Sequence, residues 1–134
     1  MKKIIILGST GSIGSQTLEI LKKDKRNFKL VLLSTNKNIN LLSKQIKIFD
    51  VKNAVVTNKK KYEIIKKKFK NINIFPDFKN IDKKIDSKVD YTMSAISGLE
   101  GLNPTLKIIK KTKRIAIANK ESIICGWGLI QKEL

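Results

Sequence analysis

Histidine is absent from this chain of 134 residues, and cysteine occurs once, at Cys125. The absence of histidine removes the commonest general base and metal ligand, and a single cysteine excludes an internal disulfide and suits a reducing compartment. Apolar runs are too short to span a bilayer. No secretory signal is expected, because Met1 and two lysines lead straight into the first expected strand. We therefore expect a cytoplasmic protein without a membrane segment.

Acidic residues and arginine are also scarce. The chain has 29 lysine and arginine residues against 11 aspartate and glutamate residues, a formal net charge of +18 that is compatible with a nucleic-acid partner. Arginine occurs only at Arg26 and Arg114, although surfaces that clamp phosphates and read bases usually depend on its planar fork. The lysines are spread through amphipathic segments such as 59–70, a pattern typical of a solvated helix face. We expect no nucleic-acid partner.

Glycine is infrequent, but three glycines form one pattern. Gly8, Gly11 and Gly14 lie between an apolar run and an amphipathic stretch, the order of strand, glycine turn and helix that opens a dinucleotide-binding unit. Glycine adopts backbone angles closed to other residues, and it lets N–H groups approach a pyrophosphate. The helix that begins near Ser12 adds free N–H donors and the positive end of its dipole. The pattern predicts a phosphate site, although a βα turn that binds nothing is the alternative.

Strands and helices are expected to alternate at the spacing of right-handed βαβ units. A chain of this length forms one domain. We expect an α/β fold: a Rossmann-like, doubly wound, mainly parallel sheet with helices on both faces. The strands are expected at 3–7, 28–34, 54–56, 73–75, 91–96 and 114–118, the helices at 12–23, 39–49, 60–69, 103–112 and from 121 onward, and a loop with one helical turn at 77–88.

Glycines and polar residues gather where strands are expected to end, at 8–14, 35–38, 98–101 and 119–122. In a parallel sheet these loops meet at the edge where ligands bind. An NAD site usually has an acidic residue at the end of the second strand, about 20 residues after the glycine turn, but segment 34–38 contains none. A carboxylate would repel a 2′-phosphate, whereas lysine, hydroxyl and amide groups attract it. This loop therefore favours NADP.

The last of these loops carries Asn119, Lys120 and Glu121 in succession. Lysine can neutralise a substrate hydroxyl or phosphate, and glutamate can accept a hydrogen bond from an amide or a ribose. The same segment also suits the start of a helix, with Asn119 or Ser122 capping free N–H groups and Glu121 in the first turn. Capping and ligand binding are compatible.

Together these segments resemble one family, 1-deoxy-D-xylulose 5-phosphate reductoisomerase. The shared segments are Ile-Leu-Gly-Ser-Thr-Gly-Ser-Ile-Gly at 6–14, the Lys37-Asn38 loop, Ala-x-x-Gly-x-x-Gly-Leu-x-Pro-Thr at 95–105, and Ala-Asn-Lys-Glu-Ser at 118–122. Any one of them is weak evidence, but four in this order over residues 4–126 are specific. The chain resembles the amino-terminal domain of that family almost from end to end.

The resemblance implies a substrate contact at Lys120 and a set of cofactor contacts. The implied NADPH contacts are Thr10, Gly11, Ser12, Ile13, Asn36, Lys37, Asn38, Asn119 and Glu121. The implied reaction rearranges 1-deoxy-D-xylulose 5-phosphate and reduces the intermediate with NADPH to 2-C-methyl-D-erythritol 4-phosphate, in non-mevalonate isoprenoid biosynthesis. The resemblance also implies a divalent metal, Mg²⁺ or Mn²⁺, that polarises the carbonyl, and a homodimeric full-length enzyme.

Two departures from the family pattern matter. Asn36 stands where the family often has glycine, but asparagine tolerates left-handed backbone angles better than most residues. The family's metal-binding carboxylates, substrate-phosphate residues and lid follow the Asn-Lys-Glu-Ser motif, beyond residue 134. We therefore expect residues 1–134 to be an incomplete NADPH-binding domain of a longer enzyme. It would hold no catalytic or metal-binding residue and would bind nucleotide without turnover.

Two other functions compete with this interpretation. An NADP-dependent semialdehyde-type dehydrogenase would use Cys125 as its nucleophile. The neighbours of Cys125 are apolar and the chain has no histidine to activate it, so we expect a buried, inert thiol. The alternative from a different class is a non-catalytic nucleotide-binding module.

Overall fold

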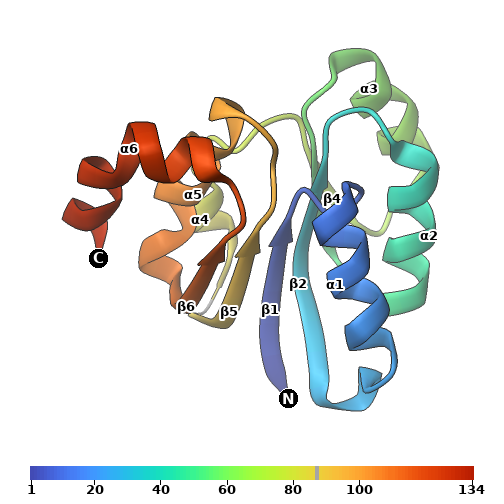
Figure 1. The fold of residues 1–134 in the computed structure, drawn as a ribbon. Helices are drawn as coiled ribbons and strands as arrows, with labels where there is room; N and C mark the ends of the chain where they lie inside the picture. Colours follow the sequence, from blue (N-terminus) through green and yellow to red (C-terminus); the bar gives the residue numbers. More distant parts are fainter. Residues whose placement is uncertain (87) are drawn as a thin grey trace.

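The computed structural model describes residues 1–86 and 88–134. Its single six-stranded sheet has the order β4-β3-β2-β1-β5-β6, and every neighbouring pair of strands is parallel (Figure 1). The strands are β1 (Lys2–Leu7), β2 (Phe28–Thr35), β3 (Asn53–Val56), β4 (Asn73–Phe75), β5 (Val89–Ser94) and β6 (Thr112–Ile117). The helices are α1 (Ser12–Lys22), α2 (Ile39–Phe49), α3 (Lys59–Lys68), α4 (Ile81–Lys84), α5 (Leu102–Ile108) and α6 (Lys120–Glu133), with 3₁₀ turns η1 (Lys25–Asn27), η2 (Leu99–Gly101) and η3 (Ile109–Lys111).

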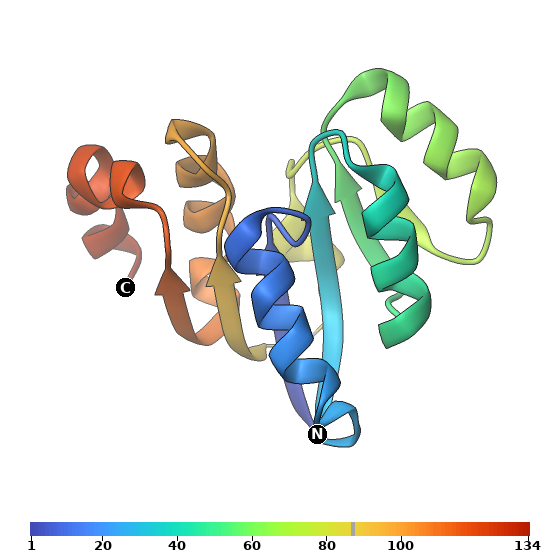
Figure 2. The same cartoon turned by 45° about the vertical axis from the view of Figure 1, so that its right-hand side comes forward.

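Helices cover both faces of the sheet. α1, α2 and α3 lie on one face and α4 and α5 on the other (Figure 1 and Figure 2). Because successive strand residues point to opposite faces, the fully buried neighbours Ile5 and Ile6 belong to different hydrophobic clusters. Ile6 shares its cluster with Leu18 of α1, and Ile5 shares its cluster with Ile108 of α5. The predicted doubly wound α/β fold is confirmed.

All the predicted strands and helices are present; α2 and β4 have the predicted bounds, and the others have ends shifted by one or more residues. β5 begins and ends two residues before the predicted 91–96, because after Ser94 the chain turns into the loop that leads to η2. The helix predicted at 103–112 ends earlier, in the 3₁₀ turn η3, so Thr112 begins β6. The helical turn expected within 77–88 is α4; Ser87 of that range lies outside the described residues. Within the described ranges, no helix has both the length and the apolarity that crossing a membrane requires.

The direction in which strands are added reverses between β1 and β5. β2, β3 and β4 extend the sheet on one side of β1, while β5 and β6 extend it on the other. In open α/β sheets, ligands bind in the crevice at the carboxyl ends of the two strands beside such a reversal. Leu7 lies opposite Ser94 in the β1–β5 register. The loops that begin at Gly8 and Ala95 therefore leave the sheet side by side at this crevice.

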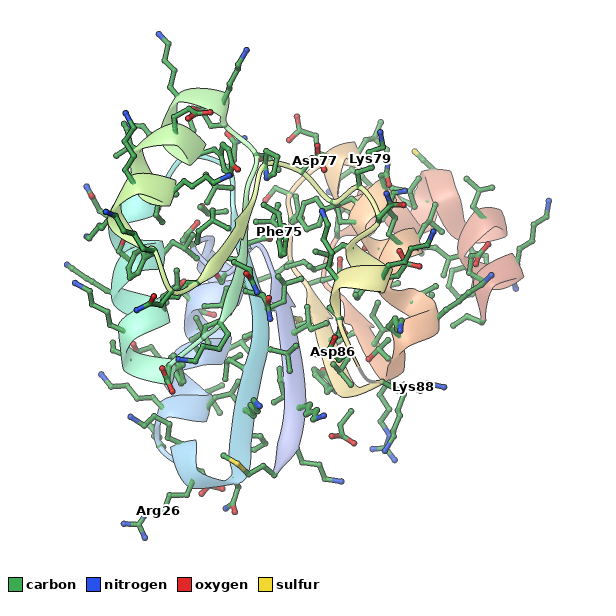
Figure 3. All side chains as sticks on the ribbon, turned by 180° about the vertical axis from the view of Figure 1, so that it is seen from behind. Arg26, Phe75, Asp77, Lys79, Asp86 and Lys88 are labelled. Carbon is green, nitrogen blue, oxygen red and sulfur yellow. The ribbon has the colours of Figure 1, made fainter. Side chains whose placement is uncertain are left out.

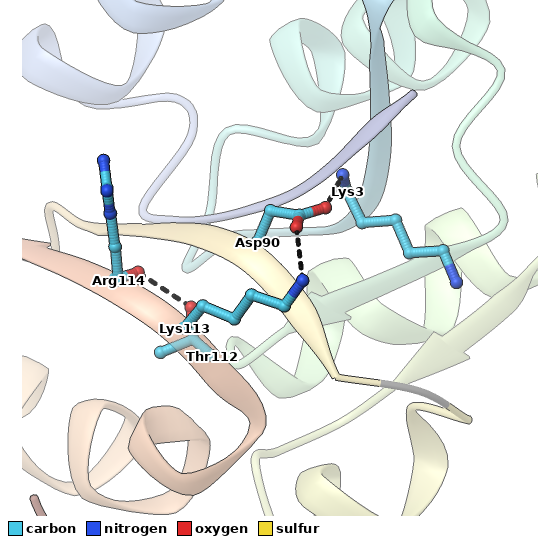
Figure 4. A network of polar contacts seen from close by, with 5 residues as sticks. All are labelled: Lys3, Asp90, Thr112, Lys113 and Arg114. Atoms are coloured by element: carbon cyan, nitrogen blue, oxygen red, sulfur yellow. Dashed lines mark hydrogen bonds and ion pairs between the residues drawn. The ribbon is translucent and has the colours of Figure 1, made fainter.

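The opposite, amino-terminal edge of the sheet is joined by Asp90 of β5 (Figure 4). The backbone N–H of Lys3 donates to Oδ2 at 2.8 Å, and Nζ of Lys113 donates to Oδ1 at 3.0 Å. These two hydrogen bonds hold the pKa of the Asp90 carboxyl below its usual range, and the bond from Lys3 has the larger effect. One carboxylate thus connects β1, β5 and β6 at the edge away from the crevice.

Candidate functional site

A cavity of about 700 Å³ lies at the crevice between β1 and β5, a volume typical of small-molecule sites. The loops after β1 and β5 line it with Gly8, Gly11 and Ala95, and further walls come from the ends of β2 and β3, the loop after β4 and the start of α5. A smaller hollow of about 340 Å³ shares residues 95–97 with it and extends to the loop after β6. The two hollows adjoin each other along the edge of the sheet where the carboxyl ends of the strands lie.

Most of the predicted site residues border these hollows. Thr10, Gly11 and Asn36 line the larger cavity. The smaller hollow is lined by five others: Ser12, Ile13, Asn119, Lys120 and Glu121. Lys37 and Asn38 line neither hollow and are exposed before α2. Asn38 has a structural partner there, since its Oδ1 accepts from the N–H of Leu41 at 3.2 Å.

The three glycines of the first loop have different physical reasons. Gly8 has φ +79°, and a Cβ there would lie 2.8 Å from the carbonyl oxygen of Ala95. A Cβ at Gly14 would lie 2.1 Å from the carbonyl oxygen of Gly8. Both glycines are therefore required by the fold itself. A Cβ at Gly11 would meet only that same oxygen at 3.6 Å, an ordinary contact, and Gly11 borders the cavity, so the side chain it lacks leaves space for a ligand.

The amino terminus of α1 is arranged to receive an anion. Gly11, its N-cap, supplies no side-chain hydrogen bond, and the first turn holds no acidic residue. By contrast, the side chains of Asn38, Asn58 and Asn119 cap α2, α3 and α6. The exposed first turn of α1 thus keeps backbone N–H donors without a side-chain partner. A pyrophosphate fits these donors and the space beside Gly11.

Buried hydroxyl and amide groups hold this loop in place. The hydroxyl of Ser9 donates to Oε1 of Gln45 at 2.8 Å, and Nε2 of Gln45 donates to the carbonyl oxygen of Ser9 at 2.9 Å. At the end of β2, Oγ of Ser34 accepts from the N–H of Gly8 at 2.8 Å. The loop at residues 8–11 is therefore anchored to both β2 and α2, so the N–H groups at the start of α1 are held in a fixed orientation.

Asn36 is held at the cavity wall by its neighbours in the sheet. Its Nδ2 donates to Oγ1 of Thr57 at 2.7 Å, and its carbonyl oxygen accepts from the N–H of Asn58 at 3.1 Å. Among the described residues other than glycine, only Asp50 and Asn80 have positive φ. The backbone of Asn36 is therefore not left-handed, although the family often has glycine at this position.

Asn119 connects the loop after β5 to α6. Its Nδ2 donates to the carbonyl oxygens of Ile96 and Gly98, and its Oδ1 accepts from the N–H of Ser122 at 3.2 Å. The residue is only 3% exposed. The predicted cap is confirmed, and both amide hydrogens are committed within the protein. Lys120, next in the chain, is exposed at the smaller hollow.

Sequence reasoning missed one wall of the larger cavity, the loop after β4. Asp77, Phe78 and Lys79 line the cavity there together with Thr57. Figure 3 shows Asp77 and Lys79 above Phe75, at the carboxyl edge of the sheet. A signal was present, because Pro76 directly follows a predicted strand and ligand loops follow strands in such sheets.

The prediction that Cys125 is buried is wrong. The thiol is exposed, because α6 buries the spaced positions Ser122, Gly126 and Ile130 and turns Cys125 away from that side. Its apolar neighbours are exposed as well; Ile124 is 76% exposed. Rapid alkylation of Cys125 would therefore report the exposure of the thiol and would not by itself support a cysteine-dependent dehydrogenase.

Metal ligands are not assigned to this chain. Among residues 1–86 and 88–134, no three histidine, cysteine, aspartate or glutamate side chains come together in a group that could hold an ion.

Comparison with protein families and curated relatives gives one consistent result. The family model described as 1-deoxy-D-xylulose 5-phosphate reductoisomerase matches residues 4–127. The reductoisomerase of Pelagibacter ubique is 56% identical over 138 residues, which cover 100% of this chain and 36% of that relative. The reductoisomerase of Thermotoga maritima is 39% identical over 134 residues, with 99% and 34% covered. The chain thus spans roughly a third of the length of the curated relatives it matches.

Solved structures agree with this result. The 1-deoxy-D-xylulose 5-phosphate reductoisomerase of Zymomonas mobilis in complex with NADPH superposes with a TM-score of 0.88 at 30% identity, covering 98% of this chain and 35% of that one. A DOX-P reductoisomerase in complex with NADPH, fosmidomycin and magnesium also gives 0.88, at 28% identity, covering 99% and 34%. With a family model that matches most of its residues and relatives that cover its full length, the chain belongs to the 1-deoxy-D-xylulose 5-phosphate reductoisomerase family.

Proposed function

We propose that this chain forms the NADPH-binding portion of an enzyme that converts 1-deoxy-D-xylulose 5-phosphate to 2-C-methyl-D-erythritol 4-phosphate. The observation that carries the proposal is the space beside Gly11 at the uncapped start of α1, within the crevice between β1 and β5. This is where a dinucleotide pyrophosphate binds in such folds. Similar proteins of known structure hold NADPH, and one also holds fosmidomycin and magnesium.

The predicted contacts divide according to the part of the cofactor that each would hold. Thr10, Gly11, Ser12 and Ile13 would hold the pyrophosphate through backbone donors at the start of α1. At the carboxyl end of β2, which has no acidic residue, the residues proposed to hold the adenosine ribose and its 2′-phosphate are Asn36, Lys37 and Asn38.

The loop after β6 would hold the opposite end of the cofactor. Because both amide hydrogens of Asn119 bind backbone carbonyls, a cofactor contact there would use its backbone or its Oδ1. Glu121 would accept from the ribose or the nicotinamide amide, and the exposed Lys120 would face the sugar phosphate. When bound, NADPH supplies the hydride; these residues orient it.

The remaining features of the enzyme are proposals for the whole protein. We propose a divalent metal ion, a homodimer and a cytoplasmic location for the enzyme, with neither a nucleic acid nor a membrane as partner. The magnesium in the similar structures supports the metal, and we propose that its ligands belong to the rest of the enzyme. An isolated chain of residues 1–134 is expected to bind NADPH and to leave it unoxidised when 1-deoxy-D-xylulose 5-phosphate is added.

Calorimetric titration of the chain with NADPH and NADH tests the cofactor. We expect NADPH to bind at least about tenfold more tightly, because charge-assisted bonds to a 2′-phosphate are worth about 1.5–3 kcal/mol. Equal affinities would contradict NADP selectivity, and no binding of either would contradict the proposal.

A chimera tests the reaction. Residues 1–127 of this chain would replace the corresponding part of the Pelagibacter ubique relative, and oxidation of NADPH would be followed with 1-deoxy-D-xylulose 5-phosphate. We expect substrate-dependent turnover by the chimera and none by the isolated chain. A chimera that folds and binds NADPH but has no turnover would contradict the proposed function, and turnover by the isolated chain would contradict its expected dependence on the rest of the enzyme.

A further inference from the structure

The loop between β4 and α4 has no role in the function proposed above, yet it forms part of the cofactor cavity. Asp77, Phe78 and Lys79 all line that cavity. The loop also has a defined conformation: the N–H of Lys79 binds Oδ1 of Asp77 at 2.9 Å, and the N–H of Ile81 binds the carbonyl oxygen of Phe78 at 3.1 Å. Ile81 itself is 1% exposed and belongs to the core under α4. The loop is thus a fixed wall of the cavity.

Strand register places this wall beside the end of β2. Thr35 pairs with Val56, and Val55 pairs with Phe75. One position beyond the first pair, Asn36 meets Thr57, with 2.7 Å between Nδ2 and Oγ1. Two positions beyond the second pair, the same register brings Asp77 opposite Thr57, and both residues line the cavity. The loop that carries Lys79 therefore lies on the same side of the crevice as Asn36, where the adenosine ribose is proposed to bind.

Lys37, the lysine that the sequence analysis places at the cofactor, is not among the cations that line the cavity. Lys79 and Lys107 line the cavity, whereas Lys37 does not. Lys107 belongs to α5, which follows β5 on the other side of the crevice, while Lys79 follows the β2–β3–β4 edge. Two carboxylates, Asp77 and Glu100, also line the cavity. A cation is therefore needed near the ribose to offset Asp77 if a 2′-phosphate is to bind there.

We propose that Lys79 provides a second positive charge, in addition to Lys37, that recognises the 2′-phosphate of NADPH, and that it is a specificity-determining residue of the cofactor site. This inference rests on the proposed function, since it assumes that NADPH occupies the cavity. Asp77 acts in the opposite direction: its carboxylate repels the 2′-phosphate and can accept hydrogen bonds from the free ribose hydroxyls of NADH. The selectivity of the chain then reflects the balance between these two neighbouring side chains.

Three variants test the balance by titration with NADPH and NADH. Lys79→Ala should weaken NADPH about tenfold or more, the loss expected for a charge-assisted bond, and leave NADH within about twofold. Asp77→Asn keeps the Oδ1 acceptor for the N–H of Lys79 and removes only the charge, so it should raise the preference for NADPH. Lys83→Ala is the matched control, because Lys83 is exposed in α4 and lines neither hollow.

The fragments 2′,5′-ADP and 5′-AMP provide a second readout, because they differ only in the 2′-phosphate. Lys79→Ala should remove most of the difference in their affinities. If Lys79→Ala keeps the unaltered ratio of NADPH to NADH affinity, the inference is overturned and the proposed function stands. If the unaltered chain binds neither dinucleotide, both are overturned.

Discussion

Gly14 lies so close to Gly8 that a Cβ at position 14 would stand 2.1 Å from the Gly8 carbonyl oxygen. The obstacle is backbone, which no side-chain rotation removes. The first turn of α1 therefore packs against the loop at residues 8–11, and that loop is hydrogen-bonded to Ser34 and Gln45. Close approach at this point therefore sets where the first N–H groups of α1 lie.

The first prediction is that Gly14→Ala lowers the free energy of unfolding by about 3 kcal/mol, the upper end of what overpacking usually costs, or prevents folding. Urea denaturation measures the loss. The matched control is Gly128→Ala in α6, where nothing lies within 4 Å of the added Cβ. Alanine should stabilise that helix by about 0.5–1 kcal/mol. Equal denaturation midpoints for the two variants would contradict the steric explanation.

Gly11→Ala should separate binding from folding. Its Cβ finds only an ordinary 3.6 Å contact within the protein, so the denaturation midpoint should stay close to that of the unaltered chain. The added methyl group enters the space proposed for the pyrophosphate, and we expect NADPH affinity to fall about tenfold or more, a change of about 1.4 kcal/mol. Calorimetry of the folded variant measures it. Unchanged affinity would place the pyrophosphate elsewhere.

How far the sequence predicts this molecule depends on the range of the interactions involved. Ile5 and Ile6 belong to a continuous apolar run, which is typical of a strand buried on both faces, and the loops after the strands carry their own glycines and polar residues. Local signals of this kind predicted the fold and the edge of the sheet that holds the site. The start of α6, with Asn119 or Ser122 as its cap, was predicted from a local signal of the same kind.

What the sequence did not predict depends on tertiary contacts. The wall formed by Asp77 and Lys79 depends on the pairing of β4, a strand of three residues, with β3. Pro76 marks the end of that strand, but the sequence does not indicate which strand it pairs with. The exposure of Cys125 depends on which side of α6 packs against α5. A Cβ at Gly126 would lie 2.4 Å from Cδ1 of Leu102 in α5, and this close approach leaves Cys125 exposed.

Asn119 and Ser122 should respond in opposite ways to single substitutions. Asn119→Asp replaces the amide that donates to the carbonyl oxygens of Ile96 and Gly98 with a carboxylate that cannot donate. We expect a loss of about 1–3 kcal/mol, the cost of leaving buried polar groups unpaired. The hydroxyl of Ser122 is buried and has no hydrogen-bond partner among the residues that the structure describes. Ser122→Ala should therefore be neutral or stabilising by up to about 1 kcal/mol.

Thermal or urea unfolding at neutral pH compares the two variants. The expected order of stability is Ser122→Ala at or above the unaltered chain, and Asn119→Asp below both. If Asn119→Asp is as stable as the unaltered chain, the link between the loop after β5 and α6 does not depend on the amide. If Ser122→Ala is the less stable of the two, the hydroxyl of Ser122 has a partner in solution.

Asp90 should make stability depend on pH in the acid range. Its pKa is lowered in the folded state by the backbone N–H of Lys3 and the ammonium of Lys113, so the unfolded chain binds the proton more readily than the folded one. The stabilisation is therefore fully present above the unfolded pKa, about 3.9 for aspartate, and is lost as pH falls through the lower folded value. Asp90→Asn cannot ionise, so its loss of stability against the unaltered chain should be largest near neutral pH and should shrink below about pH 4.

Asp50→Asn is the control, because the Asp50–Lys52 pair is largely exposed and such pairs contribute little. Urea titrations from neutral to acid pH measure the loss in free energy of unfolding of Asp90→Asn. If this loss stays constant over that range, the charge of Asp90 does not hold β1 to β5.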